Sequence, residues 1–139
     1  EIYVPITPPP VWTPVTKELK DMTVALVTAA GVHLKSDKRF NLAGDFSYRI
    51  IPGDASVKDM MVSHGGYDNG EVNKDINCMF PIDPMRTLAE EGFIKALSPI
   101  NIGFMGGGGD QRKFTEETGP EIAQKLKEAG VDAVLLTAG

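Results

Sequence analysis

The stretch that decides the fold is Thr23-Val24-Ala25-Leu26-Val27-Thr28. It is a continuous, mostly apolar run of β-forming residues, as expected of a strand covered on both faces within a parallel sheet. Two similar runs, Ile100 to Phe104 and Val131 to Leu136, come later, and a helical pattern precedes each of them. Strands joined by helices predict a mostly parallel sheet with right-handed crossovers. The fold class is therefore predicted as α/β, with a Rossmann-like three-layer sandwich.

Two helices are expected between these strands. The first opens at Pro81-Ile82-Asp83-Pro84, where Asp83 can cap it, and it ends at Gly92. The second begins near Gln111, restarts at Gly119-Pro120 and ends at Gly130.

Two further strands are predicted before the helices. Residues 46–51 alternate and are rich in β formers, and residues 57–63 form a shorter apolar segment. Asp45, Arg49 and Asp54 bracket the first of these segments. We interpret them as a salt-bridged edge in preference to a site of chemistry.

The chain is expected to consist of an arm and one domain. Residues 1–16 contain five of the ten prolines, which favours extended or polyproline II backbone and excludes helix. This arm is either laid over a partner or is a plain surface extension. Residues 17–139 are assigned to the α/β domain. Its last strand, Val131 to Leu136, needs cover on both faces and no crossover helix follows it, so the domain is expected to be incomplete at its C-terminus.

Composition narrows the function classes. The net charge is -5, and basic residues form no aromatic-rich patch, which argues against nucleic acid as a partner. The longest apolar stretch, Met22 to Val32, is too short to span a bilayer, and the first residues do not resemble a signal peptide. Cys78 is the single cysteine, so no internal disulfide is available and a reducing cytoplasm is expected. We expect Cys78 in the core or beside a helix.

Four small-residue loops follow the predicted strands. They are residues 29–31, residues 64–66, the run Gly106, Gly107, Gly108 and Gly109, and residues 137–139. If the strands are parallel, these loops meet at the rim where ligands of such sheets bind. The glycine run fits neither G-x-G-x-x-G nor a P-loop, so a nucleotide site is weakly supported. A backbone nest that binds an anion and a plain flexible loop both remain open.

The most polar candidate cluster at this rim is His64, Tyr67 and Asp68. His64 can exchange a proton near neutral pH, Asp68 can orient it, and Tyr67 can donate to a substrate carboxylate. A purely structural hydrogen-bonding role for His64 remains the alternative. His33 is a second candidate proton donor. Two histidines this far apart do not suggest a metal site, and the chain offers no convincing nucleophile of its own.

Several motifs together resemble the selenoprotein B family of glycine, sarcosine and betaine reductases. They are residues 23–28, Val62-Ser63-His64-Gly65-Gly66-Tyr67-Asp68, Phe80-Pro81-Ile82-Asp83 and residues 129–137. Residues 30–37, residues 102–110 and Leu136-Thr137-Ala138-Gly139 are most similar to the members that act on D-proline. The resemblance covers nearly the whole chain, from about Val15 to Gly139.

The resemblance implies both chemistry and a missing residue. Family members continue after Thr-Ala-Gly with selenocysteine and Gly-Thr-Cys, so selenocysteine is expected immediately after Gly139, at a codon read as termination. The implied reaction is reductive cleavage of D-proline to 5-aminovalerate, with a pyruvoyl group on a partner subunit and an electron-donor protein that supplies a dithiol. An oligomeric assembly is implied. No catalytic residue lies in this chain, which is expected to be inactive alone. His64, Tyr67, Asp68 and the glycine run would shape the substrate rim.

Three rival interpretations remain. The substrate can be glycine, sarcosine or betaine instead of D-proline. The chain can be a non-catalytic domain that binds an anion or a nucleotide. It can also be a scaffold piece whose proline-rich arm and strand edge only hold partners.

Overall fold

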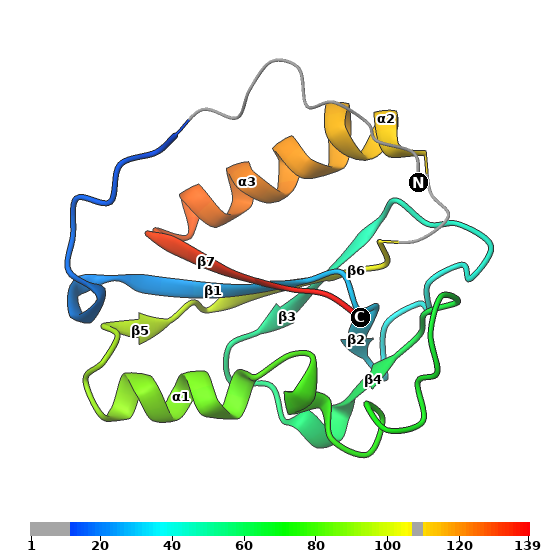
Figure 1. Ribbon diagram of the computed structural model, residues 1–139, viewed down its shortest axis with the longest axis horizontal. Coiled ribbons are helices and arrows are strands. Elements are labelled where there is room, and N and C mark those ends of the chain that lie inside the picture. Colours follow the sequence, from blue (N-terminus) through cyan, green and yellow to red (C-terminus); the bar gives the residue numbers. More distant parts are fainter. Residues whose placement is uncertain (1–11, 107–109) are drawn as a thin grey trace.

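The computed structural model describes residues 12–106 and 110–139 (Figure 1). The strands are β1 (Thr23–Thr28), β2 (Val32–Leu34), β3 (Tyr48–Pro52), β4 (Met60–Val62), β5 (Ala96–Leu97), β6 (Ile100–Phe104) and β7 (Ala133–Thr137). The helices are α1 (Ile82–Glu90), α2 (Gln111–Lys113) and α3 (Gly119–Glu128), a π-helical turn Phe114–Thr118, and three short 3-10 turns, η1 (Leu19–Asp21), η2 (Val57–Asp59) and η3 (Ile76–Cys78). The arm predicted over residues 1–16 lies largely outside the described residues, and its described part, residues 12–16, has no regular secondary structure.

β1 is the centre of a five-stranded, mostly parallel sheet. Val27 pairs in parallel with Ile102 of β6 and with Leu136 of β7, so these strands lie on opposite edges of β1. β5 pairs in parallel with the start of β1, at Thr23 and Val24. The predicted α/β class and the mostly parallel sheet are confirmed.

Two of the predicted strands are arranged differently from the parallel prediction. The segment predicted at residues 46–51 is β3, and it runs antiparallel to β6. The segment predicted at residues 57–63 becomes η2 followed by β4, which pairs antiparallel with β2 in a separate two-stranded sheet. An alternating or apolar pattern specifies which face of a strand is buried, but it does not specify the direction in which the strand pairs.

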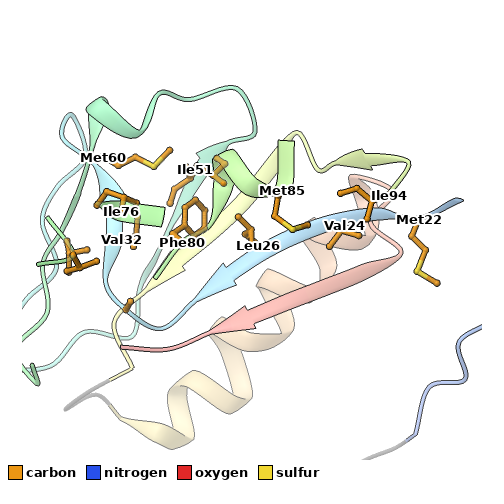
Figure 2. Close-up of a cluster of buried hydrophobic side chains, with 14 residues drawn as sticks. Met22, Val24, Leu26, Val32, Ile51, Met60, Ile76, Phe80, Met85 and Ile94 are labelled. Atoms are coloured by element: carbon orange, nitrogen blue, oxygen red, sulfur yellow. The ribbon is translucent and has the colours of Figure 1, made fainter. Parts of the chain in front are cut away.

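Helices lie on both sides of the main sheet, α1 on one face and α3 on the other (Figure 1). Side chains of β1 alternate between the two cores that result. Val24 and Leu26 face the larger core, which Phe80 and Met85 complete (Figure 2). Val27 faces the second core, where α3 contributes its apolar stripe. Burial on both faces explains the continuous apolar run of β1, and each fully buried Leu or Ile contributes about 1.5–3 kcal/mol.

The helix ends follow from the sequence, although one cap differs. Gly92 and Gly130 end α1 and α3 with φ of 77° and 73°, values that L side chains avoid. Asp83 does not cap α1: Pro81 occupies the N-cap, and Asp83 lies in the first turn, where it pairs with Arg86 at 2.7 Å. The carboxylate still lies near the helix N-terminus, which is favourable for its charge.

The second helical region begins at Gln111 and α3 begins at Gly119, as predicted, although the backbone between α2 and α3 stays helical as a π-helical turn. Asp110 caps α2 by accepting hydrogen bonds from the amides of Arg112 and Lys113. The π-helical turn then leads directly into α3, and the Gly119 amide donates to Phe114 O. Pro120 has no N–H to donate, and the wider turn before it accommodates the proline within the helix.

The bracketing charges of β3 do not form the predicted salt-bridged edge. Arg49 donates to Ser47 Oγ and to two backbone carbonyls, and its guanidinium lies 4.5 Å from the Phe40 ring centroid. Burial tends to raise the pKa of Asp45, but hydrogen bonds from Ser47 and Asn41 outweigh it and lower this pKa. No helix in the described part of the chain is long and apolar enough to cross a membrane.

Candidate functional site

The carboxyl ends of β1, β6 and β7 lie side by side. Thr28, the last residue of β1, pairs with Gly103 on one side and with Thr137 on the other. The loop after β1 then bridges its neighbours, because the Ala29 amide donates to Thr137 O at 2.9 Å and the Gly31 amide donates to Phe104 O at 2.9 Å. The loop after β1 and the ends of β6 and β7 therefore meet at one rim.

Gly31 joins the β1 loop to the segment after β4. Its φ is 76°, and a Cβ at this position would clash with the carbonyl oxygen of Ser63. The Ser63 amide in turn donates to Gly31 O at 3.0 Å. This close approach brings residues 64–67 to the rim, even though β4 belongs to the other sheet.

His64 and Tyr67 lie together at this rim. Their ring centroids are 4.8 Å apart, and the Tyr67 hydroxyl donates to Ala30 O at 2.8 Å. His64 Nδ1 accepts from the Gly66 amide at 2.8 Å, so the proton of the neutral ring lies on Nε2. Partial burial lowers the pKa of His64, which favours this neutral form at pH 7.

Gly139 lies against the Tyr67 ring. A Cβ added at Gly139 would clash with Cε1 of that ring, so the backbone at Gly139 packs closely against the tyrosine. Burial raises the pKa of the Tyr67 hydroxyl, and the charge of Cys78 raises it further. The tyrosine therefore stays protonated at neutral pH and keeps its hydrogen bond to Ala30.

Asp68 does not orient His64. Asp68 is exposed, and its Oδ1 accepts from the Gly70 amide at 2.9 Å, a contact within its own turn. The hydrogen bonds of the described residues join His64 to the Gly66 amide instead. Asp68 is close to the rim in sequence, but its carboxylate stabilises the loop.

His33 is fully buried beside the rim. Its Nδ1 lies 2.7 Å from Leu34 O and its Nε2 lies 2.9 Å from Ser63 Oγ. A carbonyl oxygen can only accept, so Nδ1 carries the proton and Nε2 accepts from the serine hydroxyl. Both ring nitrogens are thus occupied. A proton-donor role for His33 stays a prediction, and it would require this pair to separate.

A cavity of about 300 Å³ lies beside Gly106, at the carboxyl end of β6. Its walls include three aromatic rings, those of Phe46, Phe104 and Phe114, and the carboxylates of Asp45 and Asp110. Gly107, Gly108 and Gly109 lie outside the described residues, so Gly106 is the described member of the predicted glycine run. A Cβ on Gly106 would contact Cβ of Ala29 at 3.1 Å, which places the cavity beside the β1 loop.

Sequence reasoning missed the contribution of residues 76–80. Met79 O accepts from Thr137 Oγ1 at 2.6 Å and from Thr28 Oγ1 at 3.4 Å, which fixes this segment beneath the ends of β1 and β7. Cys78 directly precedes Met79 in this segment and is exposed. The predicted core position for Cys78 is therefore wrong: Cys78 is the last residue of the 3-10 turn η3. No sequence pattern marks these long-range contacts.

The described residues contain no group of three or more His, Cys, Asp and Glu side chains that could hold a metal ion. The rim instead contains a neutral imidazole, a half-buried phenol hydroxyl, an exposed thiol and backbone groups. This set can bind and position a small polar molecule, but it includes no activated nucleophile among the described groups.

Comparison with known proteins identifies relatives over almost the whole chain. Residues 6–139 match the family described as glycine/sarcosine/betaine reductase selenoprotein B. The chain is 91% identical, over all of its 139 residues, to the D-proline reductase subunit gamma of Acetoanaerobium sticklandii, and it spans 57% of that relative. No solved structure matches the chain.

More distant relatives act on other substrates, according to their names. The chain is 35% identical over 135 residues to the glycine reductase complex component B subunit gamma of Carboxydothermus hydrogenoformans. It is 35% identical over 132 residues to the sarcosine reductase complex component B subunit beta of Peptoclostridium acidaminophilum. In both cases the match covers 89% of this chain and 29% of the relative.

Proposed function

This chain belongs to the glycine/sarcosine/betaine reductase selenoprotein B family, and we propose that it is part of a subunit that cleaves D-proline reductively to 5-aminovalerate. The observation that carries the proposal is the 91% identity to a D-proline reductase subunit, maintained over the whole chain. Identity to glycine and sarcosine reductase components is 35%, which favours D-proline as the substrate.

The proposed reactive residue is a selenocysteine that directly follows Gly139. The position suits such a group, because Gly139 leaves the sheet at the rim where the β1 loop and Tyr67 meet. Ligands of parallel sheets bind beyond the carboxyl ends of the strands. A helix that starts after Gly139 would also present its N-terminus to the selenium, which favours the anionic selenolate.

When present, the selenolate would supply the nucleophile that displaces the ring nitrogen from the α-carbon of proline. A pyruvoyl group on a partner subunit would withdraw electrons from that nitrogen, and a dithiol donor would supply the two electrons that the C–N cleavage consumes. The residues of this chain position the substrate. His64 donates from Nε2 to the substrate carboxylate, because Nδ1 is held by the Gly66 amide. The Tyr67 ring forms a wall against which the residue after Gly139 is held.

The remaining features of the proposal concern the complete subunit. Its α/β domain, here residues 17–139, forms a Rossmann-like three-layer core, and the proline-rich residues 1–16 form an arm. The subunit works in the cytoplasm, in an oligomeric complex with the pyruvoyl subunit and an electron-donor protein. The 139-residue chain alone is inactive, because it lacks both the selenocysteine and the cysteine that follows it.

The test is an assay of the purified complex, with its complete subunit, on D-proline, glycine, sarcosine and betaine. Formation of 5-aminovalerate from D-proline, with no comparable turnover of the other three, is the expected result. Turnover of glycine, sarcosine or betaine without 5-aminovalerate would assign the subunit to another branch. Micromolar binding of mononucleotides without any reductase activity would instead favour a non-catalytic domain.

Variants test the role given to the rim. His64→Phe keeps an aromatic ring but removes the Nε2 donor, and it is expected to lower kcat/KM for D-proline by about tenfold or more. The matched control is Glu90→Gln, an exposed change at the far end of α1. Equal activity of the two variants would refute the proposed contact of His64 with the substrate.

A further inference from the structure

A groove of about 360 Å³ runs between α3 and β7. Its walls are almost entirely apolar and include Ile122, Ala123 and Leu126 of α3 and Val134 and Leu136 of β7. We infer that this groove is the seat of a helix that directly follows Gly139 in the complete subunit, and that the next strand pairs in parallel with the free edge of β7. The inference rests on the proposed function only in taking the subunit to continue past Gly139.

β7 shows the exposure expected of a strand that is only half covered. Within residues 12–106 and 110–139, β7 pairs with β1 and with no other strand. Val134 and Leu136 lie opposite Ala25 and Val27, and so project to the same face of the sheet as α3. Their exposed fractions are 42% and 72%, whereas Val27 beside them is 6% exposed. A long apolar edge left open in this way is an aggregation hazard, which a folded subunit has to cover.

The handedness of the connections selects a helix as the occupant. α3 carries the chain from β6 across β1 to β7, and α1 lies on the opposite face of the sheet (Figure 1). A further parallel strand at the free edge of β7 would extend the sheet in the same direction, from β6 through β1 and β7 outward. A right-handed crossover then places the connecting helix on the face of α3, which is the face that bears the groove.

The length of the relatives supplies enough chain for this unit. The match to D-proline reductase subunit gamma covers 57% of that protein, so more than two fifths of it lies outside the match. A crossover with its helix needs about a dozen residues or more. Gly139 lies two residues after the end of β7, so a continuing chain starts beside the strand that forms one wall of the groove. A second copy of the subunit fits the groove less well, because the chain that continues past Gly139 would lie between that copy and this edge.

The arrangement has a consequence for the rim. The connection after β1 leads toward the α1 face, whereas the inferred helix after β7 lies on the α3 face. Adjacent parallel strands whose connections diverge to opposite faces open a crevice at their carboxyl ends, and this is where ligands bind in such sheets. The crevice falls between Thr28 and Thr137, beside Gly139.

The test measures protection of the groove in the complete subunit, with serine in place of the selenocysteine and with Cys78→Ser. Leu136→Cys reports on the groove, and Phe93→Cys, at a residue 60% exposed just after α1, is the matched control. Maleimide labelling at each site is read by mass spectrometry of the corresponding peptide. The expected result is labelling of Leu136→Cys at least tenfold slower than that of Phe93→Cys under native conditions, and equal labelling in denaturant. Equal native rates would overturn the inference.

A second measurement avoids any disturbance by the cysteine. In the complete subunit without substitutions in the groove, hydrogen exchange should be slow for all amides of β7. Every second amide of β7 points away from β1, toward the edge where the next strand is inferred to pair. Fast exchange of these amides would refute the inferred strand. Protection of the groove and of β7 should also be independent of subunit concentration and of partner subunits. Protection that appears only on self-association, or only when a partner is added, would show that another chain covers the groove and would refute the inference.

Failure of this inference and failure of the proposed function give different results. The labelling uses a serine variant and requires no turnover. An active subunit with an open groove refutes the inference alone, whereas a protected groove in a subunit that does not act on D-proline refutes the function alone.

Discussion

Ser63→Ala is expected to destabilise the protein through His33. Ser63 Oγ lies 2.9 Å from Nε2 of His33, a ring that is 0% exposed and whose Nδ1 is already committed to Leu34 O. Removal of the hydroxyl leaves Nε2 without its donor in a site that water does not reach. A buried polar group left unsatisfied in this way costs about 1–3 kcal/mol.

The effect is large enough to measure by urea denaturation. A loss of about 2 kcal/mol lowers the ratio of folded to unfolded protein by roughly 30-fold. With a slope of about 2 kcal/mol per molar urea, the midpoint of unfolding falls by about 1 M. The matched control is Ser36→Ala, at an exposed turn residue, which is expected to change stability by less than about 0.5 kcal/mol.

A double-mutant cycle assigns the loss to the pair. His33→Phe replaces the imidazole by a ring without nitrogen, and in that background Ser63→Ala should cost clearly less than it does in the original protein. Equal costs in the two backgrounds, or a cost for Ser63→Ala that matches that for Ser36→Ala, would refute the hydrogen bond between Ser63 and His33.

Gly31→Ala should destabilise the fold by about 3 kcal/mol in thermal or urea unfolding, because φ is 76° and the carbonyl oxygen of Ser63 occupies the space of the new Cβ. Gly92→Ala is the control, since its φ is 77° but the space around it is open, and it should cost only about 1 kcal/mol. Equal costs for the two variants would contradict the close approach of Gly31 to Ser63. A hydrogen bond from Lys17 lowers the pKa of Asp132 below its ordinary value of 3.8. The ion pair of Lys17 with Asp132 therefore contributes its full stabilisation above pH 3.8, and this contribution is lost as pH falls through the lower pKa of the folded state. In the original protein the urea midpoint of unfolding should fall between about pH 5 and pH 2, and Asp132→Asn should make this fall smaller. An unchanged pH profile would contradict the contribution of the pair. Cys78 is exposed, so iodoacetamide should alkylate it in the native protein nearly as fast as in denaturant, and strong native protection would show that the thiol is buried.

The central strand and the ends of the helices were predictable because local chemistry determines them. Residues 23–28 are apolar without alternation, which requires cover on both faces, and β1 has that cover. Gly92 and Gly130 end their helices at positive φ. The exposed β7 was also foreseeable, because a strand with three consecutive apolar residues, Val134 to Leu136, needs more cover than residues 12–106 and 110–139 provide.

The remaining features depend on contacts between distant segments. The pairing of His33 with Ser63 follows from the antiparallel register of β2 and β4, which places His33 opposite Met61. The buried Asn101 bonds to the Leu26 amide at 2.8 Å, across 75 residues of sequence. Periodicity identifies buried faces but not the partner or direction of a strand, and these contacts could not be predicted from it.

At the candidate site, the rim was predicted better than the roles of its side chains. The loop after β1 and the carboxyl ends of β6 and β7 meet because the three strands are parallel. The predicted pairing of Asp68 with His64 was wrong, because Asn, Asp and similar side chains often bond to the backbone of their own turn, as Asp68 does with Gly70.

The most direct test of the account is mass spectrometry of the natural subunit, isolated from the cells that make it, on the peptide that contains Ala138 and Gly139. The account predicts that this peptide continues past Gly139 into a residue with the isotope pattern of selenium, followed by Gly-Thr-Cys. A natural subunit whose carboxyl terminus is Gly139 itself, or whose next residue contains no selenium, would contradict it.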